Sequence, residues 1–244
     1  FNNIGLIITD EQHRFGVEQR GYLLDKSTQN NITPDILVMT ATPIPRTLSM
    51  TIYGDIDVSS ITEKPEGRKD IITKWVQLKE NDTQYNLFDK IDGYIKSGEQ
   101  VFFVYPMIEE TSKMDIKAAV AEYEFLSKKV FINRNVGLLH GRMKQNEKVD
   151  IIEKFKNKEI DILVTTSIIE VGIDIPAANV MVIENAERFG LAQLHQLRGR
   201  IGRSNRQAYC FLLTKILSDE IMARMNVLVK TNDGFKISYE DLKL

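Results

Sequence analysis

A single cysteine, Cys210, is the only thiol in the 244 residues, so the chain cannot form an intramolecular disulfide. Cys210 lies in the apolar segment AYCFLL, where we expect it to pack as a small core residue. A chain without disulfides is typical of a reducing compartment, and we expect the cytoplasm. There is also no apolar run long enough to span a bilayer and no signal-peptide pattern. We therefore expect neither a disulfide-stapled secreted domain nor a membrane protein.

The sequence also lacks an excess of positive charge, because 32 Lys and Arg against 34 Asp and Glu give a formal net charge of -2. This balance argues against a protein covered in positive charge for nucleic acid, so any such surface must be local. The 43% of hydrophobic residues are enough for a core and argue against a disordered chain. The length predicts one or two domains.

Short apolar runs alternate with amphipathic stretches along the chain. The runs are continuous rather than alternating, which is typical of strands covered on both faces. The predicted strands are IGLIIT, DILVMT, VFFVY, VGLLH, DILVTT, NVMVIE and AYCFLL. The predicted helices cover residues 84–96, 116–128, 146–157 and 191–199. This order predicts an α/β fold with parallel sheets, and the polar segment 62–70 is the expected interdomain linker.

Ligands of open parallel sheets bind beyond the carboxyl ends of the strands, so the residues that follow the apolar runs are the first to inspect. These residues are Asp10, Glu11, Thr40, Ala41, Thr42, His140, Gly141, Arg142, Thr166 and Ser167, followed later by Asp174, Gln196, Arg198, Arg200 and Arg203. Paired carboxylates open the series and arginines close it. This division suits phosphoryl transfer, in which one carboxylate holds Mg²⁺, a second orients water, and cations stabilise the charge on the phosphoryl group.

Taken one at a time, these residues have plainer explanations. The Asp10–Glu11 pair alone would be a solvated strand end or a helix cap. The two threonines at 40 and 42 would be loop residues that satisfy nearby backbone groups. The arginines would be a solvated face or a general anion patch, and His140 would belong to a tight strand-to-helix turn.

Five segments together resemble, in order, motifs II to VI of superfamily 2 helicases. They are DEQH, TATPIPRT, GLLHGRM, TTSIIEVGIDIP and QLHQLRGRIGR. Within that superfamily, DEQHRFGVEQR, MTATPIPRTLSMTIYGDID, YPMIEE and ERFGLAQLHQLRGRIGR resemble the RecG family of bacterial DNA helicases. The transcription-repair coupling factor has a similar motor and is the alternative, but its motif II usually reads DEEH.

The resemblance implies RecA-like parallel sheets flanked by helices, with a partial first helicase lobe and a complete second lobe. Residues 1–64 would be the C-terminal part of the first RecA-like lobe, with motifs II and III. Residues 65–215 would be the second lobe, with motifs IV to VI. Residues 216–244 would begin a helical extension that couples ATP hydrolysis to translocation. The implied activity is ATP-driven remodelling of branched DNA, such as stalled replication forks and recombination intermediates.

ATP and Mg²⁺ are the cofactors that the resemblance implies. Asp10 would hold Mg²⁺ through water, and Glu11 would position or deprotonate the attacking water. The residues implied to sense or contact the nucleotide are Gln12, His13, Gly172 and Asp174. The catalytic residues implied for motif VI are Gln196, Arg200 and Arg203, with Arg203 as the arginine finger and Arg200 as its partner. Their spacing also predicts that these three lie on one helical face, and Gly199 and Gly202 are expected to end that helix near Arg203.

Branched or forked DNA, contacted mainly through its phosphate backbone, is the implied partner. The residues implied to bind DNA or to couple it to the nucleotide are Thr40, Thr42, His140, Gly141, Arg142, Thr166 and Glu170. The resemblance also implies a bacterial, nucleoid-associated protein with no membrane partner.

The sequence departs from the helicase pattern because no G-x-x-x-x-G-K-[ST] segment occurs, so the loop that cradles phosphates is missing. The chain begins at Phe1 and runs straight into a strand, and the wedge domain of the RecG family is missing too. We therefore expect a fragment of a longer protein that is inactive as an ATPase alone.

Two hypotheses of other classes stay open at this point. One is a nucleic-acid-binding module without ATPase activity. The other is a metal hydrolase that uses Asp10, Glu11 and His13, although adjacent side chains on an extended strand point to opposite faces and make poor common ligands.

Overall fold

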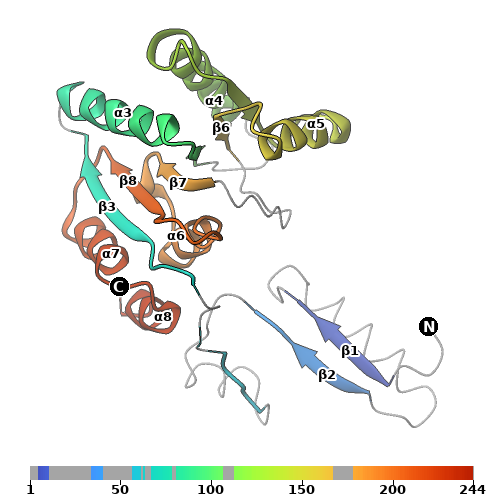
Figure 1. Cartoon of the computed structure of the whole chain (residues 1–244). Helices are drawn as coiled ribbons and strands as arrows, with labels where there is room; N and C mark the ends of the chain where they lie inside the picture. Colours follow the sequence, from blue (N-terminus) through green and yellow to red (C-terminus); the bar gives the residue numbers. More distant parts are fainter. Residues whose placement is uncertain are drawn as a thin grey trace.

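The computed structural model describes residues 5–10, 34–40, 57–61, 63, 67–78, 81–106, 113–166 and 178–243 (Figure 1). The strands are β1 (Leu6–Thr9), β2 (Asp35–Val38), β3 (Ile72–Gln77), β4 (Gln100–Val104), β5 (Val136–Leu139), β6 (Ile162–Thr165), β7 (Ala178–Ile183) and β8 (Tyr209–Thr214). The helices are α3 (Asn81–Lys96), α4 (Lys113–Phe125), η3 (Leu126–Val130), α5 (Gln145–Lys156), η4 (Ala186–Arg188), α6 (Leu191–Arg198), α7 (Asp219–Lys230) and α8 (Gly234–Asp241).

The strands form two sheets. β1 pairs with β2, and the other six strands run in the order β3-β8-β7-β4-β6-β5. Every strand pair is parallel. The predicted α/β class with helix-flanked parallel sheets is therefore confirmed.

Helices cover both faces of the six-stranded sheet, and its central strands are completely buried. Along β4, Phe102 and Val104 pack into the core on the side of α5, α6, α7 and α8. The alternating residues Val101 and Phe103 pack into the opposite core, against α3 and the η3 turn (Figure 1). Because both faces are covered, β4, β6 and β7 are apolar at most positions, with Gln100, Thr165 and Asn179 as buried polar exceptions.

The continuous apolar runs also predicted that both faces of β1 and β2 are covered, and this prediction is wrong for the described part of the chain. Ile8 in β1 is 58% exposed and Leu37 in β2 is 48% exposed. Leu6 and Ile36 are exposed as well. Two strands can bury little of each other's surface. An apolar run therefore predicts a strand that must be covered, but it does not show which other element covers it.

Some elements were not predicted from the sequence. β3 contains the exposed residues Ile72 and Lys74, and it lies at the edge of its sheet, so its apolar signal is weak.

The helix predicted for 116–128 corresponds to α4 followed by the π turn η3. Residues 219–241 form α7 and α8, in the region expected to be helical. Within the described part of the chain, none of the helices combines the length and the apolar character that a membrane span needs.

Candidate active site

The carboxyl ends of β1 and β2 bring two of the predicted residues to one edge. Thr9 lies opposite Val38, and the Met39 amide donates a hydrogen bond of 2.8 Å to the Thr9 carbonyl. Asp10 and Thr40 therefore follow neighbouring parallel strands at the same edge, as the sequence predicted. The other residues predicted for this edge are Glu11, Gln12, His13 and Thr42, and they lie outside the described residues. The metal-hydrolase hypothesis needs Glu11 and His13, so it stays a prediction.

His140 and Thr166 are neighbours at the carboxyl edge of the six-stranded sheet. Leu139 at the end of β5 pairs with Thr165 at the end of β6, and the Thr166 amide donates to the Leu139 carbonyl at 3.3 Å. The Thr166 hydroxyl and the Nδ1 atom of His140 are both buried and have no hydrogen-bond partner in the described structure. Unsatisfied buried polar atoms are rare in folded proteins, so this pair marks an edge where a ligand could supply the missing partner.

The surroundings of His140 disfavour the charged form of its imidazole. Burial lowers the pKa of His140, and the positive charges of Lys148 and Arg142 lower the pKa further against the opposing effect of Glu147. Lys148 reaches back from α5 and donates a hydrogen bond of 2.8 Å to the Gly141 carbonyl. This end of the sheet therefore combines exposed cations with unsatisfied polar groups, which suits an anionic ligand.

The residues predicted for motif VI do not share one helical face. Gln196 lies in α6, but the helix ends at Arg198, with Gly199 as its C-cap. Arg200 and Arg203 lie on the following loop, where Gly202 has a φ of +71°. The predicted common face is wrong because the two glycines end the helix one turn earlier and redirect the chain. Arg203 is exposed and Arg200 is partly buried.

Arg198 points into the protein rather than toward a ligand. Its side chain is 2% exposed, and one guanidinium nitrogen donates to the Thr73 hydroxyl and to the Leu228 and Thr231 carbonyls, at 3.1, 2.7 and 3.0 Å. It thereby joins α6 to β3 and to the end of α7. The sequence signal was its position four residues after the buried Leu194, on the same side of α6.

Two buried polar residues at the middle of the same edge were missed. Tyr105 follows β4, Glu184 follows β7, and the Glu184 amide donates to the Val104 carbonyl at 2.9 Å. Glu184 is 5% exposed, and burial raises the pKa of its carboxyl to about 7, with a further rise caused by Glu122 and a smaller opposing effect of Lys215. The signal was available, because Glu184 directly follows an apolar run, the criterion that selected the other residues.

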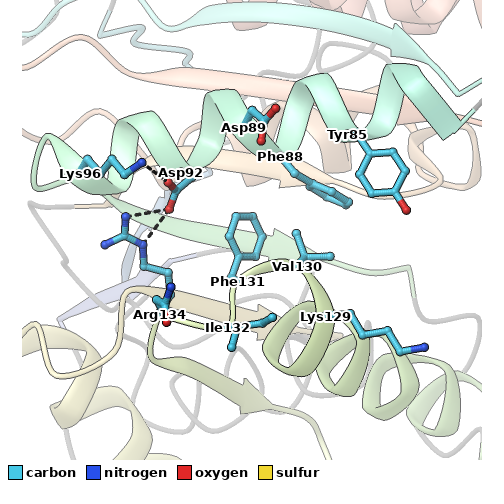
Figure 2. Close-up of a pocket in the computed structure, with 11 residues that line it drawn as sticks. Tyr85, Phe88, Asp89, Asp92, Lys96, Lys129, Val130, Phe131, Ile132 and Arg134 are labelled. Atoms are coloured by element: carbon cyan, nitrogen blue, oxygen red, sulfur yellow. Dashed lines mark hydrogen bonds and ion pairs between the residues drawn. The ribbon is translucent and has the colours of Figure 1, made fainter.

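The structure also has a pocket of about 370 Å³ that none of the predicted site residues lines. It lies between α3 and residues 129–134, which lead from η3 toward β5 (Figure 2). Asp92 accepts hydrogen bonds from Arg134 Nε at 2.8 Å and lies 2.8 Å from Lys96 Nζ. These contacts fix one wall of the pocket.

The chain is similar to known proteins along its whole length. Residues 84–205, half of the chain, match the family described as "Helicase conserved C-terminal domain". The "ATP-dependent DNA helicase RecG" of Aquifex aeolicus is 53% identical over 248 residues, and that of Thermotoga maritima is 50% identical over 243 residues. Both alignments cover 100% of this chain and 30% of the relative. The chain therefore spans about a third of the length of these relatives.

Solved structures give the same picture. The structure described as "RecG bound to three-way DNA junction" has a TM-score of 0.76 and 47% identity, and the match covers 100% of this chain and 30% of that one. Saccharomyces cerevisiae Dbp5 bound to RNA and ADP BeF3 has a TM-score of 0.61 at 18% identity, over 93% of this chain and 57% of that one. The second likeness supports the fold alone.

Proposed function

The chain belongs to the helicase conserved C-terminal domain family, and from that membership we propose that it is the C-terminal motor part of an ATP-dependent DNA helicase of the RecG kind. In this proposal residues 1–64 complete the nucleotide-facing end of a first lobe, residues 65–215 are the second lobe, and residues 216–244 begin the coupling extension. The carrying observation is the 53% identity to a RecG helicase along the entire chain. The full-length protein would remodel branched DNA.

The residues present suit MgATP. A carboxylate oxygen such as that of Asp10 is the ligand that Mg²⁺ prefers, and Mg²⁺ supplies charge neutralisation between phosphate oxygens. Asp10 would hold a water shared with the ion. Glu11 would orient the attacking water and accept its proton, while Gln12 and His13 would contact the nucleotide from the same edge.

Arg203 and Arg200 would act from the second lobe. A guanidinium is planar and donates several hydrogen bonds to phosphate oxygens at once, so it suits the charge that develops during phosphoryl transfer. Arg203 is the exposed member of the pair and would be the arginine finger, with Arg200 as its partner. Gln196, Gly172 and Asp174 would complete this side of the nucleotide site.

DNA would bind along the carboxyl edge near β5 and β6. The unsatisfied Nδ1 atom of His140, the unsatisfied Thr166 hydroxyl and the exposed Arg142 suit a phosphate group. The residues proposed to bind or couple DNA are His140, Gly141, Arg142, Thr166 and Glu170 near β5 and β6, together with Thr40 and Thr42 after β2. A motor that moves along any sequence needs contacts with phosphate rather than with bases. We place this action in the bacterial cytoplasm, on the nucleoid.

The rest of the longer protein would supply two things. One is the phosphate-binding loop, because the sequence contains no G-x-x-x-x-G-K-[ST]. The other is cover for the apolar side chains of β1 and β2 that are exposed in the described part of the chain. A wedge domain for the DNA fork would be part of the same missing region.

ATP hydrolysis by two purified proteins tests the proposal. We expect the full-length protein to hydrolyse ATP in response to branched DNA and to lose this activity on Glu11→Gln. The 244-residue chain alone should show no DNA-stimulated hydrolysis. Robust turnover by the chain alone, abolished by Glu11→Gln, would contradict the division of the site between this chain and the missing region.

A further inference from the structure

The segment 67–71, which leads into β3, packs against the loop that follows α6. Arg68 Nε donates to the Gly202 carbonyl at 3.1 Å, and Arg68 Nη2 donates to the Gly199 carbonyl at 3.4 Å. In the reverse direction, the side-chain amide of Gln207 donates to the Asp70 carbonyl at 2.6 Å. The two segments are more than 130 residues apart in sequence and hold each other in both directions.

The two carbonyls that Arg68 binds are special positions in this loop. A peptide group is planar, so the carbonyl of Gly199 and the amide nitrogen of Arg200 lie in one plane. The carbonyl of Gly202 and the amide nitrogen of Arg203 lie in another. One guanidinium therefore holds the two peptide planes from which the side chains of Arg200 and Arg203 depart.

The backbone around these planes leaves little room for another arrangement. Gly202 has a φ of +71°, and a Cβ atom placed on it would lie 3.1 Å from the Ala208 Cβ and 3.3 Å from Ile71 Cγ1. On the other segment, Gly67 has a φ of +81°, and a Cβ atom there would lie 2.9 Å from Asn205 Oδ1. Glycine at both positions lets the segment and the loop approach closely in a conformation that other residues rarely adopt.

We propose that Arg68 is a positioning residue that orients the Arg200 and Arg203 loop toward the nucleotide. This inference rests on the proposed function. Segment 67–71 lies at the end of the expected interdomain linker, so a movement of the linker would be transmitted through Arg68 to the loop. A fork that binds two carbonyls at once suits this role, since a lysine ammonium is a single point and holds one of them at best.

The test compares variants of the full-length protein in DNA-stimulated ATPase assays. Arg68→Gln should lower kcat by about 10- to 100-fold, because a misplaced catalytic group costs about that much, while the ATP KM stays within about threefold. Arg68→Lys should recover only part of the loss. The matched control is Arg206→Gln, which removes another guanidinium of the same loop, one that binds Glu99 Oε1 at 2.9 Å, and should retain most activity.

A double-mutant cycle separates positioning from a general structural role. If Arg68 acts through Arg203, then Arg68→Gln should reduce the residual single-turnover rate of an Arg203→Ala protein by less than about threefold. Amide hydrogen exchange in residues 199–208 should rise in Arg68→Gln while exchange in the six-stranded sheet is unchanged. An equal fold loss in both backgrounds, or wild-type kcat in Arg68→Gln beside a dead Arg203→Ala, would overturn this inference alone. Near-normal turnover of Arg203→Ala would overturn both the inference and the proposed arginine finger.

Discussion

The two sheets of this chain are built from strands with the same sequence character but with opposite exposure. Ile8 and Leu37 in the two-stranded sheet are about half exposed, whereas Val101, Phe103 and Val182 in the six-stranded sheet are completely buried. The six-stranded sheet has helices on both faces, and each of its inner strands β8, β7, β4 and β6 pairs with a strand on either side. The difference teaches that a continuous apolar run indicates a strand that requires cover, and that the cover is decided by other parts of the protein.

This comparison predicts that the two regions contribute unequally to the stability of the chain. Phe103→Ala should lower the free energy of unfolding by about 3 to 5 kcal/mol, because it opens a cavity in a core with no exposed surface. Urea denaturation of the 244-residue chain measures this. The control is Phe235→Ala on α8, where the ring is 41% exposed and the loss should stay near 1 kcal/mol. Equal losses would refute the assignment of the main core.

The buried carboxyl of Glu184 should make the six-stranded region less stable as the pH rises. Its folded pKa is about 7, against an ordinary value of 4.5, so the folded state keeps a proton that the unfolded state loses. The cost is absent below about pH 4.5, grows between pH 4.5 and 7, and reaches about 3 kcal/mol above that range. Glu184→Gln should therefore stabilise the chain at pH 8 by up to that amount and hardly at pH 4.5.

Unfolding curves at the two pH values measure the effect of Glu184. Asp35→Asn provides the control, because Asp35 is an exposed carboxylate of the two-stranded sheet. It should change the unfolding free energy by less than about 0.5 kcal/mol at either pH. A Glu184→Gln effect that did not depend on pH would contradict the role of burial.

The smallest effect is expected for Ile8, and it should depend on which protein carries the change. In the 244-residue chain, Ile8→Thr should alter the unfolding free energy by less than about 0.5 kcal/mol, because the side chain is already 58% exposed. In the full-length protein the same change should cost about 1 to 3 kcal/mol if the missing region covers β1. Thermal unfolding of both proteins decides this, and an equal small effect would mean that β1 stays uncovered.

The fold was largely predictable because most strands are continuous apolar runs. The runs that became β4 and β7 were recognised for this reason, whereas β3 was not, since Lys74 interrupts it and its edge position requires less apolar surface. The bounds of α7 were not predicted, although Ser218 caps the helix by accepting a hydrogen bond from the Ile221 amide. The cap at Ser218 could have marked the start of this helix, but the helical extension was predicted only as residues 216–244, without helix bounds.

The candidate site was predictable where strand ends alone determine it. Asp10 with Thr40, and His140 with Thr166, follow paired parallel strands, so their proximity comes from topology. The end of α6 at Gly199 was close to the predicted end of the helix, but the arrangement of Arg200 and Arg203 beyond it was not predictable from spacing, because Arg68 holds that loop from a distant segment. The roles of Glu11, Gln12, His13, Thr42, Glu170, Gly172 and Asp174 stay predictions from the resemblance.

The most direct test of the proposed motor is the rate of DNA-stimulated ATP hydrolysis by full-length Arg203→Ala. An arginine finger contributes about 10³ to 10⁵ in rate by stabilising charge in the transition state, so turnover should fall by that factor while ATP affinity stays within about tenfold. Arg203→Lys should be nearly as slow, since an ammonium lacks the planar fork. Arg206→Ala should keep most of the activity. Near-normal turnover of Arg203→Ala, or an equally inactive Arg206→Ala, would contradict the account and leave a general basic patch in its place.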